Sequence, residues 1–224
     1  MSSDCCQGTL DSPRANAGGL AASIAAAAVL FSLLFAGPLF DFWLQLTLSA
    51  LLLTASALFF GGKALRRRLR VSGHEALRAL LIGIVSAAVL YVVFYVGNLV
   101  SRGLFGFASE QIGSVYTFKE GAGVLRMTLL IALVIGPGEE IFWRGYVQNG
   151  LRRYFPRRHW VAAAGVYALV HLASGNFMLI ASALVCGLFW GWLFVRFDSL
   201  WGNILSHILW DISVFLVFPF AAQG

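Results

Sequence analysis

The stretch LRALLIGIVSAAVLYVVFYVGNLV, residues 77–100, decides the fold class of this chain. Its only charged residue, Arg78, stands at the beginning. An α-helix rises about 1.5 Å per residue and the hydrocarbon core of a bilayer is about 30 Å thick, so about 20 apolar residues are enough to cross it. The stretch therefore predicts a membrane-spanning helix.

Similar apolar runs recur along the whole chain. Of its 224 residues, 59% are hydrophobic and 12% are charged, whereas about a quarter of the residues are charged in an ordinary soluble domain. We therefore predict an all-α fold, a polytopic transmembrane helical bundle of about seven spans. The expected spans are residues 20–40, 42–60, 77–100, 125–148, 160–172, 177–195 and 200–220.

The domain organisation that follows is simple. We expect a polar cytoplasmic tail at residues 1–18 and a single membrane domain at residues 19–224. The tail lacks the basic start of a signal peptide, so we expect the first apolar run to be retained as a helix. The longest connection, residues 102–121, is expected to be an interfacial loop on the outer side.

Basic residues cluster in alternate loops, which is typical of cytoplasmic loops rather than of nucleic-acid binding. The net charge is +6. The positive-inside rule places the N-terminus in the cytoplasm and the C-terminus outside. We expect a multi-pass protein of the plasma membrane whose partner is the lipid bilayer, with no nucleic acid. The clusters are Lys63, Arg66, Arg67, Arg68 and Arg70; Arg152, Arg153, Arg157 and Arg158; and Arg196.

Few ionisable side chains interrupt the apolar runs. Each one costs about 2.5–3.5 kcal/mol at a helix centre on insertion scales, so those present are functional candidates. Counted from the basic loops at the helical rise, they lie roughly 12–20 Å deep and could meet in one layer. The candidates are Glu139, Glu140, His171, His207 and Asp211, all in the last four spans.

The fourth expected span reads GPGEEIFWR, residues 136–144. Glu140 and Arg144 are four residues apart and can pair on one helix face. Glu139 projects about 100° away from that face, so it does not take part in this pair and is available for another role. The alternative is a structural salt bridge with a spare acid.

The two histidines come from later spans. His171 precedes the turn at residues 173–176, and non-helical backbone at membrane depth is tolerated where it lines a wet cavity. His207 and Asp211 share a helix face at i, i+4. Taken singly, His171 could be a core residue, and the His207–Asp211 pair could be a hydrogen-bonded pair that neutralises itself in lipid.

Together these motifs resemble the CPBP family, also called the CAAX prenyl protease 2 or Rce1-like and Abi group of intramembrane glutamic endopeptidases. The resemblance covers about residues 125–218, which we expect to form the catalytic core. The matching motifs are Glu139-Glu140 to Arg144, Tyr167 to His171, and His207 to Asp211.

The resemblance implies that Glu139 is the general base, that His171 helps it to activate water, and that His207 with Asp211 stabilises the oxyanion. Glu140 and Arg144 would support the site. Two positions depart from the commonest family pattern. Tyr167 stands where Phe is commoner, and position 211 is Asp where many relatives have Asn. Asp211 can donate a hydrogen bond only if it is protonated.

The expected function is therefore intramembrane hydrolysis of a peptide bond in a membrane-associated protein or peptide, with no cofactor and no metal. Two alternatives stay open. A zinc peptidase could use His171, His207 and a carboxylate as ligands, although the sequence has no His-Glu-x-x-His pair. A non-enzymatic immunity or scaffold protein could keep the polar cluster only for packing.

A further motif concerns helix packing. Gly187 and Gly191 form a small-xxx-small pair, which we expect to pack helices within the molecule rather than to form a dimer.

Overall fold

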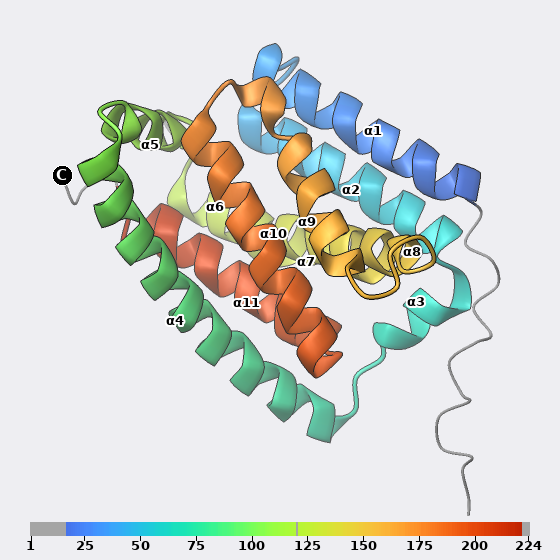
Figure 1. Cartoon of the computed structure of the whole chain (residues 1–224). Coiled ribbons are helices and arrows are strands. Elements are labelled where there is room, and N and C mark those ends of the chain that lie inside the picture. Colours follow the sequence, from blue (N-terminus) through green and yellow to red (C-terminus); the bar gives the residue numbers. More distant parts are fainter. Residues whose placement is uncertain (1–16, 120, 221–224) are drawn as a thin grey trace, which may run out of the picture.

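The protein is built from helices (Figure 1). The structure, a computed structural model, describes residues 17–119 and 121–220, and all regular elements in these ranges are helical. The predicted all-α class is thereby confirmed. Most of the expected tail, at residues 1–16, and the C-terminal Gly224 lie outside the described residues.

Within the described ranges, five helices are long and apolar enough to cross a membrane. Large apolar side chains such as Leu81, Val85 and Val92 of the third of these helices stay exposed, as they would toward lipid. The chain is a multi-pass membrane protein. The five are α1 (Ala17–Ala36), α2 (Phe42–Phe60), α4 (Gly73–Leu104), α10 (Phe177–Phe197), and α11 (Leu200–Ile212) with its continuation η5 (Ser213–Val217).

Two of the seven expected spans do not form single long α-helices. The region of residues 125–148 is a series of α- and π-helical segments, so the count of about seven spans stays a prediction. The segments are α6 (Val124–Leu130), η2 (Ile131–Ile135), α7 (Gly136–Glu140), η3 (Ile141–Gln148) and α8 (Asn149–Leu151). Pro137 lacks a backbone N–H and cannot continue a regular α-helical ladder, in agreement with the π-helical turn that precedes it.

The other irregular span is α9 (His159–Leu169), which is followed by the 3₁₀ turn η4 (Leu172–Ser174). Its 11 residues rise only about 16 Å, roughly half of the hydrocarbon core. Gly175 then adopts a left-handed φ of 62°, and Asn176 caps α10 by accepting a hydrogen bond from the Leu179 N–H at 2.9 Å. The chain therefore turns just after His171.

Two short helices replace expected loops. The basic segment after α2 contains α3 (Gly62–Arg68), and the connection expected as a loop at residues 102–121 contains α5 (Ala108–Thr117). The Asn176 side chain donates to the Gln111 carbonyl of α5 at 2.7 Å, and the Gln111 side chain accepts from the Met178 N–H at 3.1 Å. These contacts hold α5 against the start of α10.

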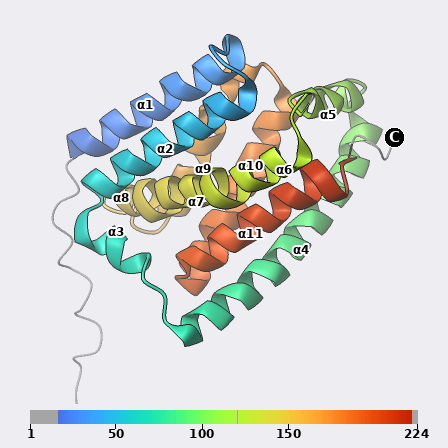
Figure 2. The ribbon, with the colours of Figure 1, turned by 180° about the vertical axis from the view of Figure 1, so that it is seen from behind.

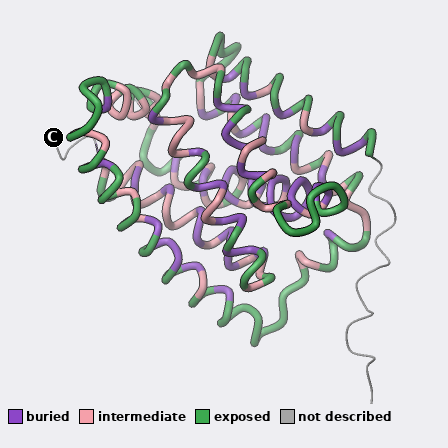
Figure 3. The backbone as a smooth tube through the Cα atoms, viewed as in Figure 1, coloured by how far each residue is buried: buried purple, intermediate pink, exposed green. Residues whose placement is uncertain are grey.

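The helices form two layers. Figure 2 shows α1, α2, the α6–α8 stretch, α11 and α4 side by side, and Figure 1 shows α9 and α10 on the other face of this row. Buried positions concentrate where the layers meet (Figure 3). The α6–α8 stretch lies between α2 and α11, so its side chains reach the centre of the molecule.

Small residues bring α10 close to α9. A Cβ at Gly187 would lie 3.0 Å from the Ala164 Cα, and one at Gly191 would lie 3.3 Å from the Trp160 carbonyl oxygen. The expected packing of this pair within the molecule is confirmed.

The three basic loops lie at one end of the bundle (Figure 1). Arg68 pairs with Asp198, which follows α10, and Arg78 donates to the Phe197 carbonyl at 2.7 Å. The Trp201 indole also donates to the Leu69 carbonyl, at 3.2 Å. The α5 helix lies at the opposite end.

Candidate active site

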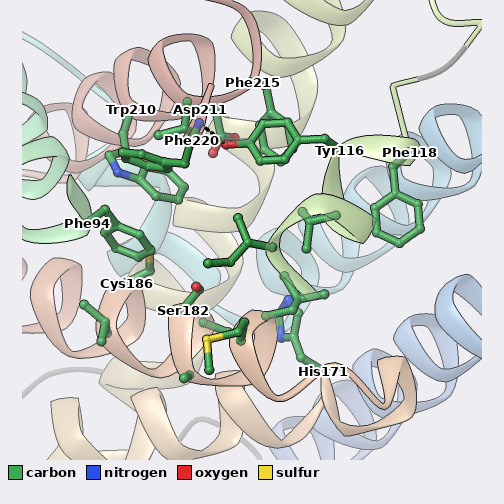
Figure 4. A pocket seen from close by; sticks show the side chains of 18 of the residues that line it. Phe94, Tyr116, Phe118, His171, Ser182, Cys186, Trp210, Asp211, Phe215 and Phe220 are labelled. Atoms are coloured by element: carbon green, nitrogen blue, oxygen red, sulfur yellow. Dashed lines mark hydrogen bonds between the residues drawn. The ribbon is translucent and has the colours of Figure 1, made fainter. Parts of the chain in front are cut away.

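A cavity of about 440 Å³ lies between the two layers. Its walls are mainly aromatic and aliphatic, and Figure 4 shows His171, Cys186 and Asp211 around it. Five polar side chains of the predicted motifs line this one cavity, namely Glu139, Tyr167, His171, His207 and Asp211. The structure therefore brings together residues from three separate parts of the sequence.

Glu139 is positioned by the close packing of α7. A Cβ at Gly138 would lie 2.7 Å from the Thr54 side chain of α2, and one at Gly136 would lie 2.8 Å from the Ile208 side chain of α11. Only glycine lets the helix approach both neighbours this closely. Glu139 is 8% exposed, and its Oε2 accepts a hydrogen bond from the Tyr167 hydroxyl at 2.9 Å.

His171 lies two residues after the end of α9 and one helical turn after Tyr167. Its Nδ1 is 2.7 Å from the Tyr167 carbonyl oxygen. A carbonyl can only accept, so Nδ1 carries the hydrogen and the neutral ring has Nε2 as its acceptor. The rings of Phe31 and Phe35 pack around it at centroid distances of 5.1 and 5.6 Å. His171 is thus held in an apolar setting with one nitrogen able to accept a proton.

Glu140 does not line the cavity and instead forms the centre of a buried network. It is fully buried and accepts from Arg144 Nη1 at 2.9 Å, which confirms the predicted pair. It also accepts from Asn203 Nδ2 at 3.2 Å and is 2.8 Å from His207 Nδ1. The carboxylate therefore joins its own helix to α11.

Arg144 is enclosed by further partners. Its Nη2 donates to the Cys186 carbonyl at 3.4 Å, and its guanidinium lies 5.2 Å from the ring centroids of both Tyr167 and Trp190. Aromatic faces stabilise a desolvated cation. The Glu140–Arg144 pair is thus a structural element beneath the cavity wall.

His207 connects this network to the cavity. With Nδ1 donating to Glu140, its Nε2 is 3.5 Å from Asp211 Oδ2. The Trp190 indole stacks on the imidazole at a centroid distance of 4.0 Å with the planes 19° apart. The ring orientation is therefore fixed from two sides.

Three residues contribute to the site in ways that the sequence did not predict. Asn203 is a neutral amide and escapes a search for ionisable residues, although it lies four residues before His207 on α11. Tyr167 was noted only as the aromatic residue of the His171 motif, and the contact of its hydroxyl with Glu139 was not expected. Trp190 carries no sequence signal beyond its apolar run.

Metal ligands are not assembled within residues 17–119 and 121–220. No group of three His, Cys, Asp or Glu side chains in these ranges is close enough to hold one ion.

Comparison with known proteins finds one family that part of the chain resembles. No curated protein and no solved structure matches the chain. Residues 121–213, however, match the family described as type II CAAX prenyl endopeptidase Rce1-like. All six predicted site residues fall within the matched range. The predicted resemblance to Rce1-like CAAX proteases is confirmed over residues 121–213, and this match supports a protease at a coarse level.

Proposed function

We propose that the protein is a metal-independent intramembrane endopeptidase in which Glu139 and His171 activate a water molecule. The observation that carries this proposal is the division of labour between two adjacent acids. Glu140 is occupied by Arg144 and His207, whereas Glu139 faces the cavity and has the Tyr167 hydroxyl as a partner. A carboxylate in this position can take a proton.

The chemistry would proceed in two steps. Water held between Glu139 and His171 Nε2 loses a proton to Glu139 as its oxygen attacks the carbonyl carbon. This general-base catalysis is typically worth about 10²–10⁴-fold. The tetrahedral intermediate then collapses, the C–N bond breaks, and the proton passes from Glu139 to the leaving amine.

The negative charge that develops on the carbonyl oxygen during the attack needs hydrogen-bond donors. His207 as an imidazolium would donate from Nδ1 to Glu140 and from Nε2 into the cavity, where Asp211 lies 3.5 Å away. Removing one oxyanion donor typically costs about 10²–10³-fold in kcat. We assign this role to His207 together with Asp211.

The substrate class follows from the family and the cavity. A CAAX-protease family implies a membrane-associated protein substrate, and the apolar walls of the cavity suit an apolar substrate segment. We propose a membrane-associated protein or peptide, cleaved by the core at about residues 125–218 within one membrane domain at residues 19–224.

The experiment that tests this function compares membrane proteomes of cells carrying the native protein or its Glu139→Ala variant. The expected difference is a truncated terminus on one or a few membrane proteins, seen only with the native protein. A Glu139→Ala protein with its full cellular effect would favour the immunity or scaffold alternative. Activity that vanishes with chelator and returns with zinc would favour the zinc peptidase.

We further propose a plasma-membrane location with the N-terminus in the cytoplasm. Single cysteines at positions 67, 157 and 224, after replacement of Cys5, Cys6 and Cys186, should report this. The sites at 67 and 157 should resist a membrane-impermeant label in intact cells, and the site at 224 should react, because basic loops stay cytoplasmic. Labelling of the cysteines at positions 67 and 157 from outside the cell would contradict the proposed membrane orientation.

Tyr167→Phe should shift the acid limb of the kcat/KM profile to higher pH. The hydroxyl donates to Glu139 at 2.9 Å and so favours the ionised base. Without it, Glu139 is protonated more readily and catalysis fails earlier as the pH falls. Tyr146→Phe is the matched control, because Tyr146 is buried but does not line the cavity. Identical profiles for both variants would rule out this role of the hydroxyl.

Asp211→Asn should keep activity and extend it to higher pH. If Asp211 acts as a protonated donor, it stops donating once ionised, whereas an amide donates at every pH. Asp211→Ala, which lacks a donor, should be slower by about 10²–10³-fold. A folded Asn variant that loses nearly all turnover across the pH–rate profile would show that the carboxylate itself is required.

A further inference from the structure

Asn98 is a buried amide in the last two turns of a long apolar helix. It lies on α4, is 5% exposed and lines the cavity. Its Oδ1 accepts a hydrogen bond from Arg102 Nε at 2.9 Å. Because a guanidinium can only donate, this bond fixes which end of the amide is oxygen. The NH₂ end must therefore find an acceptor elsewhere, yet Nδ2 has no partner among the described residues.

The amide is held firmly by its surroundings. Arg102 donates from Nη1 to the Ser109 hydroxyl at 3.3 Å and from Nη2 to the Phe220 carbonyl at 3.1 Å. The Ser101 hydroxyl donates to the main-chain carbonyl of Asn98 at 3.1 Å. A buried donor without an acceptor is costly, and such groups are rare in proteins. An unpartnered donor held this rigidly at a cavity wall is suited to a ligand.

Asn98 is on α4, whereas the proposed base Glu139 is on α7 and His171 follows α9. Figure 4 shows Phe94, one helical turn before Asn98 on α4, across the pocket from His171. A chain bound along the cavity can touch both walls at once. The reacting carbonyl would be bound by His207 and Asp211, so Asn98 would meet a different group of the substrate.

We propose that Asn98 Nδ2 donates a hydrogen bond to a backbone carbonyl oxygen of the bound peptide, away from the bond that is cut. This inference rests on the proposed peptidase function and adds a binding contact to it. A carbonyl fits because the free group is a neutral donor, and the charge of Arg102 is already in contact with three acceptors. Apolar parts of a substrate offer no acceptor, so the contact would select for peptide in a cavity that otherwise accepts any apolar chain.

The test measures binding of a farnesylated peptide with a CAAX ending to detergent-solubilised full-length protein. Glu139→Gln is present throughout so that nothing is cleaved. Asn98→Leu should weaken binding about tenfold, which corresponds to about 1.4 kcal/mol. Asn98→Asp should weaken it similarly, because it can still contact Arg102 but presents an acceptor where the donor was. Ser86→Ala on the same helix is the control, since the Ser86 hydroxyl donates to the Gly83 carbonyl and Ser86 does not line the cavity.

Peptide analogues identify the acceptor. Each amide of the peptide is replaced in turn by a trans-alkene, which keeps the shape and removes the carbonyl oxygen together with the N–H. The comparison with Asn98→Leu then shows which loss involves Asn98. One analogue should bind to protein with Asn98 about tenfold more weakly than the parent peptide does. The affinity of that analogue should not fall further when Asn98→Leu is introduced. Equal binding of the parent peptide to folded Asn98→Leu and Asn98 proteins would overturn the assignment and indicate that water satisfies the amide.

The two proposals fail separately in this design. A peptide that the native protein cleaves, but that binds equally well with and without the Asn98 amide, contradicts the Asn98 contact alone. A peptide that binds through Asn98 and is never cleaved by the native protein supports the contact and contradicts the peptidase.

Discussion

Glu139→Gln should abolish peptide-bond cleavage while the protein stays folded. Glutamine keeps the shape of the side chain, and its amide oxygen can still accept from the Tyr167 hydroxyl. It cannot take a proton from water, so the rate should fall by about 10³-fold, within the range of general-base catalysis. Cleavage assays on purified protein, with thermal unfolding in the same detergent, measure the two effects separately.

The neighbouring acid provides the control for this experiment. The same isosteric change at Glu140 should act first on folding, because Glu140 lies outside the cavity lining. If purified, folded protein keeps its activity with Gln at 139 and loses it with Gln at 140, the roles of the two acids are reversed.

Glu140→Gln should destabilise the fold by about 3–5 kcal/mol, the usual cost of breaking a buried ion pair. Arg144 has a side chain only 3% exposed and would lose its carboxylate partner. The His207 ring would lose the same partner. The measurement is the yield of folded protein and its unfolding temperature in detergent.

Two comparisons sharpen this result. The double variant Glu140→Gln, Arg144→Met should lose less stability than the two single changes added together, since no buried charge is left unpaired. Asp41→Asn breaks a similar pair, with Arg126 at 2.8 Å, but both side chains are nearly half exposed. It should cost less than about 1 kcal/mol, because surface pairs contribute little. Equal losses at positions 41 and 140 would contradict a structural role for burial of the Glu140 pair.

The long helices were predictable because hydrophobic length alone determines them. The apolar run at 42–60 is α2, Phe42–Phe60. The third long helix begins at Gly73 rather than at 77, because Ser72 and Glu75 form a capping box ahead of the apolar run. The α5 helix was missed because it is short, contains Gly113 and lacks the apolar length of a span.

The site was predictable in its charged members and not in its neutral ones. The cost of burying charge in lipid singles out Glu139 and Glu140, and helical spacing pairs Glu140 with Arg144. Neutral groups carry no such cost signal, so the Tyr167 hydroxyl and the Asn203 amide emerge only from tertiary packing. The roles of Glu139, His171, His207 and Asp211 in catalysis stay predictions.

The π-helical turns have a consequence for comparing this chain with its relatives. A turn closed by i→i+5 bonds holds one more residue than the α-helical turn that it replaces. Such turns flank the two acids, at Ile131–Ile135 and Ile141–Gln148. Alignment with a relative whose helix is α throughout therefore requires a one-residue gap near these turns. A gap set on the wrong side of α7 would shift the register by one residue. Glu140 would then be equated with the first acid of the relative, and Glu139 with the residue that precedes it.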